Sequence, residues 1–489
     1  MLLRRITIIT SVLFLFAACT DSSDQNRELK DYISAYLNGN ENAVAFGNAK
    51  LTTILSKSDY QKVAMLKAIV GGQVSTFEPM IDISGPVYYV ANGPLNKDGA
   101  PEETILFVKV KDQELLKTHL ESQMGYDMNE GDGFTYTSDG DMALGIRNNL
   151  AIIIIKGGNY DEKQELTEAF AKVDGDVSTG KIAEILASDE GDAVLAMNVS
   201  NLTSSSTGEM KRLPEAKQKE LKKLFENAFV TTTFKFENGK AIIEMKNHFG
   251  KELQNKMFFN EDKSAKMLKN LGGGTPRLGF SINMDVNKME SFIEEISPGG
   301  MNEIGGSSYT MLKMMTGSSK MGQMVDGKLA LLMFGEPDES GAFEPEMNAY
   351  CGLREKGKKA LELAQSSYGD ASSFGIPELN VSDDGVSICT NAANSNGKLV
   401  MPKGAEGFGK SGISFFINLD GLNPEDIAEM FDLDDFAPAL KVAKFISFEY
   451  TNDGGKLTIT AKDGKENILK QAMEIAVDDL SSQMSGVSF

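Results

Sequence analysis

The chain has 489 residues, with 70 acidic and 49 basic side chains, and its formal net charge is −21. A surface with this excess of negative charge repels phosphate backbones, so a nucleic-acid partner is not expected. The two histidines, His119 and His248, lie too far apart in sequence for a paired-histidine zinc motif, and we expect no metal and no cofactor. The length is enough for about two or three domains.

Residues 1–18 form a predicted signal peptide. Two arginines precede an apolar run from Ile6 to Phe16, and two alanines stand just before Cys19. The run LFAAC resembles a bacterial lipobox, in which the cysteine becomes the lipidated first residue, although Phe16 stands where leucine is usual. An ordinary signal cut near Ala18 is the alternative. We expect residues 19–40 to form a lipidated tether and a leading helix, attached to the outer membrane on a face that stays undecided.

The leading helix is predicted over Arg27–Leu37, where apolar residues are four apart. The first predicted domain follows it and covers residues 41–270. Two helical pieces end at Gly71–Gly72, a typical helix stop. A hairpin is predicted around Asn238–Gly239, which is the strongest short turn signal in the chain. The other expected strands begin near residues 43, 81, 104, 134, 142, 151 and 193.

The second predicted domain covers residues 276–489, after a boundary at Leu271–Pro276 (LGGGTP). The stretch Ile413–Phe431 shows the strand-and-helix pattern of this domain most clearly. An alternating apolar run is followed by Asn423 and Pro424, a helix cap and a favoured first helical residue. Similar sequence patterns, in which a strand is followed by a turn, recur near residues 43, 193 and 278. Hairpins are predicted near residues 229 and 445. We therefore predict an α+β protein of two related halves, each an antiparallel-rich β-sheet with helices packed on one face.

Five stretches carry a resemblance to a known family: the lipobox at Cys19, Asn40–Leu55, Ile81–Val90, Phe280–Asp285 and Phe415–Asp420. Together they resemble an uncharacterised family of Bacteroidetes-type lipoproteins of about 500 residues, a family defined only as a domain of unknown function. The resemblance would cover nearly the whole mature chain. It implies a lipid-anchored envelope protein, and it brings no catalytic residues to this sequence.

Two cysteines, Cys351 and Cys389, remain after the lipidated one. In an oxidising envelope they form either a disulfide or two free thiols, and spacing alone does not decide between them. A methionine-rich stretch is the second unusual feature. Methionines adapt to irregular apolar surfaces, so this stretch is either a groove for an apolar ligand or part of a core. Its methionines are Met301, Met311, Met314, Met315, Met321 and Met324.

Catalytic motifs are incomplete in this sequence. Gly175–Ile182 (GDVSTGKI) resembles a phosphate-binding loop, but Ile182 replaces the hydroxyl that would hold Mg²⁺. Ser178 and Lys181 have the S-x-x-K spacing of penicillin-interacting enzymes without their companion motifs. We therefore predict a non-enzymatic binding or assembly scaffold with an envelope protein as partner. An envelope hydrolase using paired carboxylates and a carrier with a methionine-rich groove are the alternatives.

Overall fold

The computed structural model describes residues 27–62, 67–82, 84–96, 99–158, 160–188, 190–205, 213–298, 300, 320–336, 346–368, 379–383, 385–389, 398–430 and 437–485. The chain divides into two compact units. Unit 1 contains Met1–Asn238 together with Lys465–Phe489, and unit 2 contains Gly239–Gly464. Each unit combines helices with an antiparallel sheet, which confirms the predicted α+β class.

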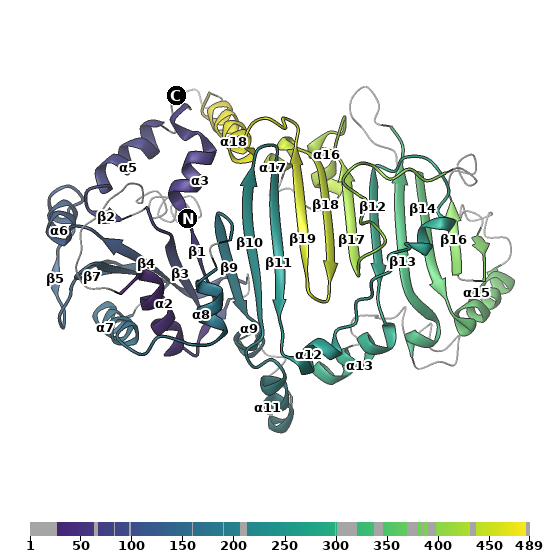
Figure 1. The fold of residues 1–489 in the computed structure, drawn as a ribbon, viewed down its shortest axis with the longest axis horizontal. Coiled ribbons are helices and arrows are strands. Elements are labelled where there is room, and N and C mark those ends of the chain that lie inside the picture. The colour runs from purple at the N-terminus through teal and green to yellow at the C-terminus, as the bar shows by residue number, and fades with distance from the viewer. Residues whose placement is uncertain are drawn as a thin grey trace. The chain divides into compact units, whose positions relative to one another are not determined.

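Unit 1 is built on an antiparallel sheet in which every pair of neighbouring strands is hydrogen-bonded. The strand order is β10 (Phe229–Glu237), β9 (Ala193–Asn198), β1 (Ala43–Ala49), β3 (Val87–Leu95), β4 (Pro101–Val110), β8 (Leu150–Lys156), β7 (Met142–Arg147), β6 (Thr135–Asp139) and β5 (Asn129–Glu130). The short β2 (Ile81–Asp82) also pairs with β4, beyond the end of β3. Figure 1 shows this sheet at the left.

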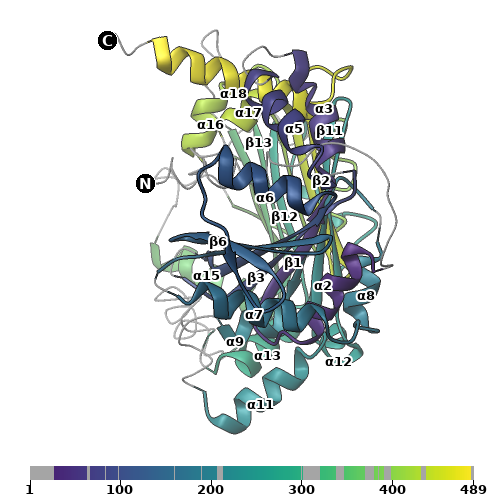
Figure 2. The ribbon, with the colours of Figure 1, turned by 90° about the vertical axis from the view of Figure 1, so that its left-hand side faces the viewer.

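Helices cover both faces of the unit 1 sheet (Figure 2). One face packs against α2 (Leu29–Asn38), α7 (Glu162–Val173) and α8 (Lys181–Leu186), and the other against α3 (Leu51–Ser58), α5 (Gly72–Phe77) and α6 (Gln113–Ser122). The prediction of helices on one face is therefore wrong for unit 1. Its central strands are almost entirely apolar because both faces are buried: Phe107 and Ile152 face α2 and α7, whereas Leu106 and Ile153 face α3 and α6.

Local signals explain where the helices of unit 1 begin. Asp112 and Asp161 stand just before α6 and α7, and each carboxylate accepts a hydrogen bond from the backbone N–H three residues later. The predicted stop at Gly71–Gly72 is wrong, because a π-helical turn over Lys67–Gly71 leads directly into α5. The helix continues until Phe77, which is buried in the core. Burial of this ring outweighs the cost of helical glycine, about 1 kcal/mol per residue.

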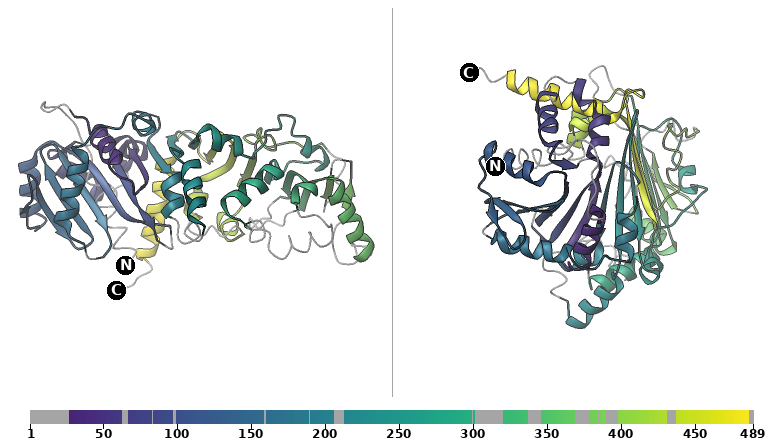
Figure 3. Two further views of the ribbon diagram at one scale, coloured as in Figure 1. Left: turned by 90° about the horizontal axis from the view of Figure 1, so that it is seen from below. Right: turned by 60° about the vertical axis from the view of Figure 1, so that its left-hand side comes forward.

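Two further helices, α9 (Val199–Ser205) and α11 (Glu215–Leu224), follow β9 in unit 1. The C-terminal helix α18 (Ile468–Ser485) also belongs to this unit, where it packs against α3 and β10. Figure 3 shows it in yellow beside the purple N-terminal helices. The predicted second domain, which extended to residue 489, therefore includes a helix that completes unit 1.

Unit 2 contains a second antiparallel sheet. Its strand order is β11 (Lys240–His248), β19 (Gly454–Ala461), β18 (Ala443–Thr451), β17 (Ile413–Asn418), β12 (Leu278–Asn283), β13 (Val325–Phe334), β14 (Glu346–Leu353), β16 (Gly385–Cys389) and β15 (Leu379–Val381). The predicted hairpin near residue 445 is confirmed, because β18 and β19 pair up to Thr451 and Gly454.

The unit 2 core also has two sides. Phe416 and Leu332 pack with Met267 and Phe408 on one face of the sheet, while Ile417 packs on the other with apolar residues of α16 (Pro424–Met430) and α17 (Ala437–Val442). The predicted cap of α16 is confirmed, since Asn423 Oδ1 accepts a hydrogen bond from the N–H of Glu425 at 3.1 Å. Among the described residues of unit 2, the other helical segments are α12 (Lys251–Lys256), η3 (Lys266–Asn270), α13 (Val286–Ile296), η4 (Met321–Gln323) and α15 (Glu355–Tyr368).

The predicted boundary at Leu271–Pro276 lies inside unit 2. Leu271 is fully buried in the core, and its carbonyl accepts a hydrogen bond from the side chain of Asn348 at 2.8 Å. Gly274 forms a parallel bridge with Leu399. The glycines that resemble a linker therefore allow a close turn inside a packed domain.

Candidate functional site

A row of polar side chains crosses unit 1 at one end of its otherwise apolar strands. Asn92 in β3 lies directly opposite Glu103 in β4, and Glu103 lies opposite Lys156 in β8. Directly opposed residues of neighbouring strands point to the same face of the sheet. The pairing register alone therefore places an amide, a carboxylate and an ammonium side by side, on the face that α2 and α7 cover.

Asn92 is the centre of this row. It is 5% exposed, and its side-chain amide donates hydrogen bonds to Glu103 at 2.5 Å and to the hydroxyl of Tyr36 at 3.2 Å. Its Oδ1 accepts a hydrogen bond from Asn40 at 2.7 Å, and Asn40 Oδ1 accepts one from the N–H of Asn42 at 3.1 Å. Burial raises the pKa of Tyr36 well above its usual range, so this hydroxyl stays protonated.

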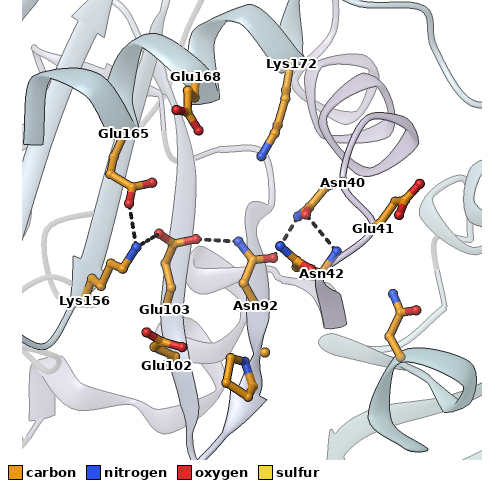
Figure 4. A pocket seen from close by; sticks show the side chains of 13 residues that line it. Asn40, Glu41, Asn42, Asn92, Glu102, Glu103, Lys156, Glu165, Glu168 and Lys172 are labelled. Carbon is orange, nitrogen blue, oxygen red and sulfur yellow. Dashed lines mark hydrogen bonds and ion pairs between the residues drawn. The ribbon is translucent and has the colours of Figure 1, made fainter. Parts of the chain in front are cut away.

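Helix α7 supplies the second wall of the site. Glu165, Glu168 and Lys172 are spaced three and four residues apart, so they share one side of the helix. Figure 4 shows them projecting from α7 toward Glu103 and Asn92. The neighbouring side of α7 fixes this orientation because its apolar residues are buried against the sheet: Leu166, Ala169, Phe170 and Val173.

Lys156 connects the two walls. Its ammonium donates a hydrogen bond to Glu165 at 2.5 Å and lies 3.6 Å from a carboxylate oxygen of Glu103. Burial works to lower the pKa of Lys156, but the hydrogen bond to Glu165 and the charges of Glu103, Glu165 and Glu102 outweigh it and raise the pKa above the usual value. The lysine is therefore held in its charged form between two carboxylates.

The turn before β1, the end of β3 and helix α9 close the site. Gly93 N–H donates a hydrogen bond to the carbonyl of Asn42 at 2.9 Å, next to an irregularity in the pairing of β3 with β1. From α9, the side-chain amide of Asn201 donates to the carbonyl of Ala43 at 2.8 Å. The side-chain oxygen of Asn198 accepts a hydrogen bond from the N–H of Asn201 at 3.2 Å, so two bonds fix this residue.

These residues surround a cavity of about 600 Å³, which we call the acidic cavity. Its lining holds five glutamates and two lysines, a formal charge of −3, together with four asparagines. The lining residues are Asn40, Glu41, Asn42, Asn92, Gly93, Pro94, Glu102, Glu103, Lys156, Glu165, Glu168, Lys172 and Asn201 (Figure 4). The volume suits a small molecule, and the lining suits a hydrophilic ligand better than an apolar one.

The carboxylates of this cavity do not form a metal centre. Within the described parts of the chain, no group of three or more His, Cys, Asp or Glu side chains is placed to hold a metal ion. Glu103 and Glu165 instead share the ammonium of Lys156. What the cavity offers a ligand is hydrogen bonding and negative charge.

None of the site residues predicted from sequence lines the acidic cavity. Cys19 and Met301, Met311, Met314 and Met315 lie outside the described residues. Met321 lies in η4, and Met324, which follows it, is 1% exposed and belongs to the core. For Met324 the structure therefore supports packing, whereas Met321 is half-buried.

Of the two alternatives left open for Cys351 and Cys389, the structure supports the unpaired one, because Cys351 carries a free thiol. The sheet register explains why. Cys351 lies opposite Val386, whereas Cys389 lies opposite Asn348, three positions along β14. At about 3.3 Å per residue the two cysteines are offset by about 10 Å along the strands, and a disulfide requires Cα atoms within about 7 Å. Burial raises the pKa of the Cys351 thiol, with a smaller effect from the charge of Asp326.

Comparisons with known proteins add little to the geometry. No protein-family model and no curated protein match the chain. Crystal form I of TP0453 is similar to it with 11% identity and a TM-score of 0.27, over 45% of this chain and 79% of that one. Crystal form III of TP0453 has 12% identity and a TM-score of 0.28, over 47% of this chain and 89% of that one. Within the described residues, no helix has the length and apolar character needed to cross a membrane.

Proposed function

We propose that this protein is a lipid-anchored binding protein of the cell envelope, and that unit 1 binds a small, hydrophilic, positively charged ligand in the acidic cavity. The single observation that carries the proposal is the row Asn40–Asn92–Glu103–Lys156–Glu165 along the wall of that cavity, which is linked by three hydrogen bonds and by the ion pair between Glu103 and Lys156. In this proposal the protein acts as a binding module and performs no reaction. An outer-membrane location and an envelope protein partner remain part of the proposal.

Preorganisation supports binding as the role of the site. Asn92 and Glu103 are 5% and 9% exposed, and each already has hydrogen-bonding or charged partners. Such side chains lose little conformational entropy when a ligand arrives, so more of the interaction energy appears as affinity. Because the lining has a formal charge of −3, the complementary ligand is an amine rather than an anion.

The anchor rests on the sequence of the N-terminus. Arg4, Arg5 and the apolar run before Cys19 have the layout of a signal peptide with a lipidation site. Replacing Cys19 with serine should move the full-length protein from the membrane fraction to the soluble fraction. Unchanged fractionation would remove the lipid anchor from the proposal and leave the binding site intact.

We further propose that the two units arose by duplication of one strand arrangement. In unit 1, β1 is followed across the sheet by β3, β4 and β8 on one side and by β9 and β10 on the other. In unit 2, β12 is followed by β13, β14 and β16 on one side and by β17 and β18 on the other. This shared connectivity supports the proposal. A superposition of the two units in an experimental structure that matched strands in a different chain order would refute it.

Isothermal titration calorimetry of the full-length protein tests the binding function. Spermidine is the cationic probe and sorbitol is the neutral one. We expect spermidine to bind and sorbitol not to bind, and the double variant Glu102→Gln, Glu168→Gln to weaken spermidine binding about tenfold or more. Both glutamates are exposed, so these changes leave the buried row intact.

The matched control for this titration is Glu121→Gln, an exposed glutamate on α6, against the opposite face of the same sheet. It should leave spermidine affinity unchanged. Absence of spermidine binding, or equal weakening by the control, would overturn the proposed function. Hydrolysis of a glycoside that stops in Glu103→Gln would favour the hydrolase alternative instead.

A further inference from the structure

A second cavity of about 430 Å³ lies beside the acidic cavity in unit 1, and we call it the lysine cavity. Its charged lining consists of three lysines and one glutamate, a formal charge of +2. The lining residues are Asn198, Ser200, Asn201, Lys219, Lys222, Lys223, Glu226, Asn227 and Phe229. A positively charged cavity is unexpected in a chain whose net charge is −21. If the lysines were distributed at random over the surface, acidic side chains would outnumber them in most places.

The sequence of α11 explains why these lysines gather. Lys219, Lys222 and Lys223 are three and four residues apart, so they lie on one side of the helix. Leu221 and Leu224 are buried and fix the rotation of the helix about its axis. Lys222 and Lys223 also stand in the last helical turn, where the negative end of the helix dipole favours cations.

The two cavities share one wall residue, Asn201. Its side chain is bonded to the carbonyl of Ala43, which directly follows Asn42 of the acidic cavity. Its N–H is bonded to the side chain of Asn198, which lines the lysine cavity. A single fixed amide therefore lies between a surface of charge −3 and a surface of charge +2.

We propose that the two cavities form one elongated site for a zwitterionic ligand of the short-peptide type. The ammonium end of the ligand lies against Glu102, Glu103 and Glu168, and its carboxylate end lies against Lys222 and Lys223. Asn201 contacts the ligand between these ends. This inference rests on the proposed function, because it assigns the acidic cavity to the cationic part of the ligand.

Charge complementarity at both ends sets the direction of binding. A peptide placed in reverse would bring its carboxylate beside five glutamates and its ammonium beside three lysines, and both contacts are repulsive. Spermidine satisfies only the acidic cavity. Both attractions should weaken as ionic strength rises, because the charges around the cavities are accessible to salt.

Calorimetry on the full-length protein tests the inference with tri- to penta-alanine peptides in two forms. One form has a free C-terminal carboxylate, and the other has a C-terminal amide and keeps only the ammonium charge. At the best length we expect the free acid to bind about tenfold or more tightly than the amide, since ionised hydrogen-bonding pairs are the stronger ones. The double variant Lys222→Gln, Lys223→Gln should abolish this preference and leave spermidine binding unchanged.

Lys163→Gln is the control, because Lys163 is an exposed lysine of α7 that lines neither cavity. It should keep the preference for the free acid. Equal affinities of the acid and the amide for the unmodified protein would overturn the two-cavity site while spermidine binding upheld the proposed function. Loss of spermidine binding in the double lysine variant would also overturn it. Failure of both spermidine and the peptides to bind would overturn the proposed function itself.

Discussion

Asn92 links three other side chains at the wall of the acidic cavity by hydrogen bonds. Its amide contacts Tyr36, Asn40 and Glu103, so its removal leaves two buried polar groups and a carboxylate without one partner each. Replacing Asn92 with alanine should therefore lower the free energy of unfolding of unit 1 by about 2–4 kcal/mol. Urea denaturation measures this loss. The control is Asn129→Ala, in the exposed edge strand β5, which should change the free energy of unfolding by less than about 0.5 kcal/mol.

Tyr89 should make unit 1 sensitive to alkali. Burial raises the pKa of Tyr89 to about 12, and its hydroxyl donates a hydrogen bond to the carbonyl of Val194 at 3.3 Å. Because the folded state keeps this proton more tightly than the unfolded state, the stabilisation is fully present below about pH 10 and is lost as the pH rises toward 12.

The variant Tyr89→Phe tests this pH dependence. Phenylalanine keeps the ring and has no proton to lose, so the variant should lose less stability than the unmodified protein between pH 10 and pH 12. Urea denaturation at pH 8, 10 and 12 gives the comparison. A parallel decline in both proteins would show that other groups determine the alkaline sensitivity.

At the scale of elements, the contact between β7 and α7 determines where Glu165 and Glu168 stand. A Cβ atom on Gly145 would lie 2.8 Å from the ring of Phe170 and 3.0 Å from Leu166, which anchor α7 to the sheet. Replacing Gly145 with valine should displace the helix, lower the free energy of unfolding by about 1–3 kcal/mol and weaken spermidine binding. Gly85→Val, where no atom lies within 4 Å of the new Cβ, is the control. Unchanged binding in Gly145→Val would show that the position of α7 is not important for the site.

Elements were predictable where their signals are local. The strand at Ile413, the Asn423 cap and the hairpin near residue 445 depend on neighbouring residues only, and each is present in the structure. The acidic cavity depends instead on register. Asn92, Glu103 and Lys156 each stand near one end of an apolar strand, a pattern visible in the sequence, but only the pairing of three strands shows that these ends coincide.

At the scale of the whole molecule, chain order is a poor guide to the two units. The glycine-rich run at Leu271–Pro276 was predicted as a boundary because glycine and proline often mark linkers, yet its first residue is buried in a core. The actual divisions fall at Asn238/Gly239 and Gly464/Lys465. The second division is invisible in the sequence, because nothing local shows that α18 packs against α3, more than 400 residues earlier in the chain.

The return of α18 to unit 1 predicts an unusual response to truncation. Asn467 donates a side-chain hydrogen bond to the carbonyl of Phe236 at 3.1 Å, and α18 packs against α3 and β10. A chain that ends at Gly464 therefore exposes apolar surface of unit 1. In hydrogen exchange measured by mass spectrometry, peptides from α3 and β10 should lose protection while those from β12 and β13 keep theirs. A chain that ends at Ser485 keeps all of α18 and should behave like the full-length protein. Loss of protection confined to β12 and β13 would show that the C-terminal segment belongs with unit 2, as chain order suggested.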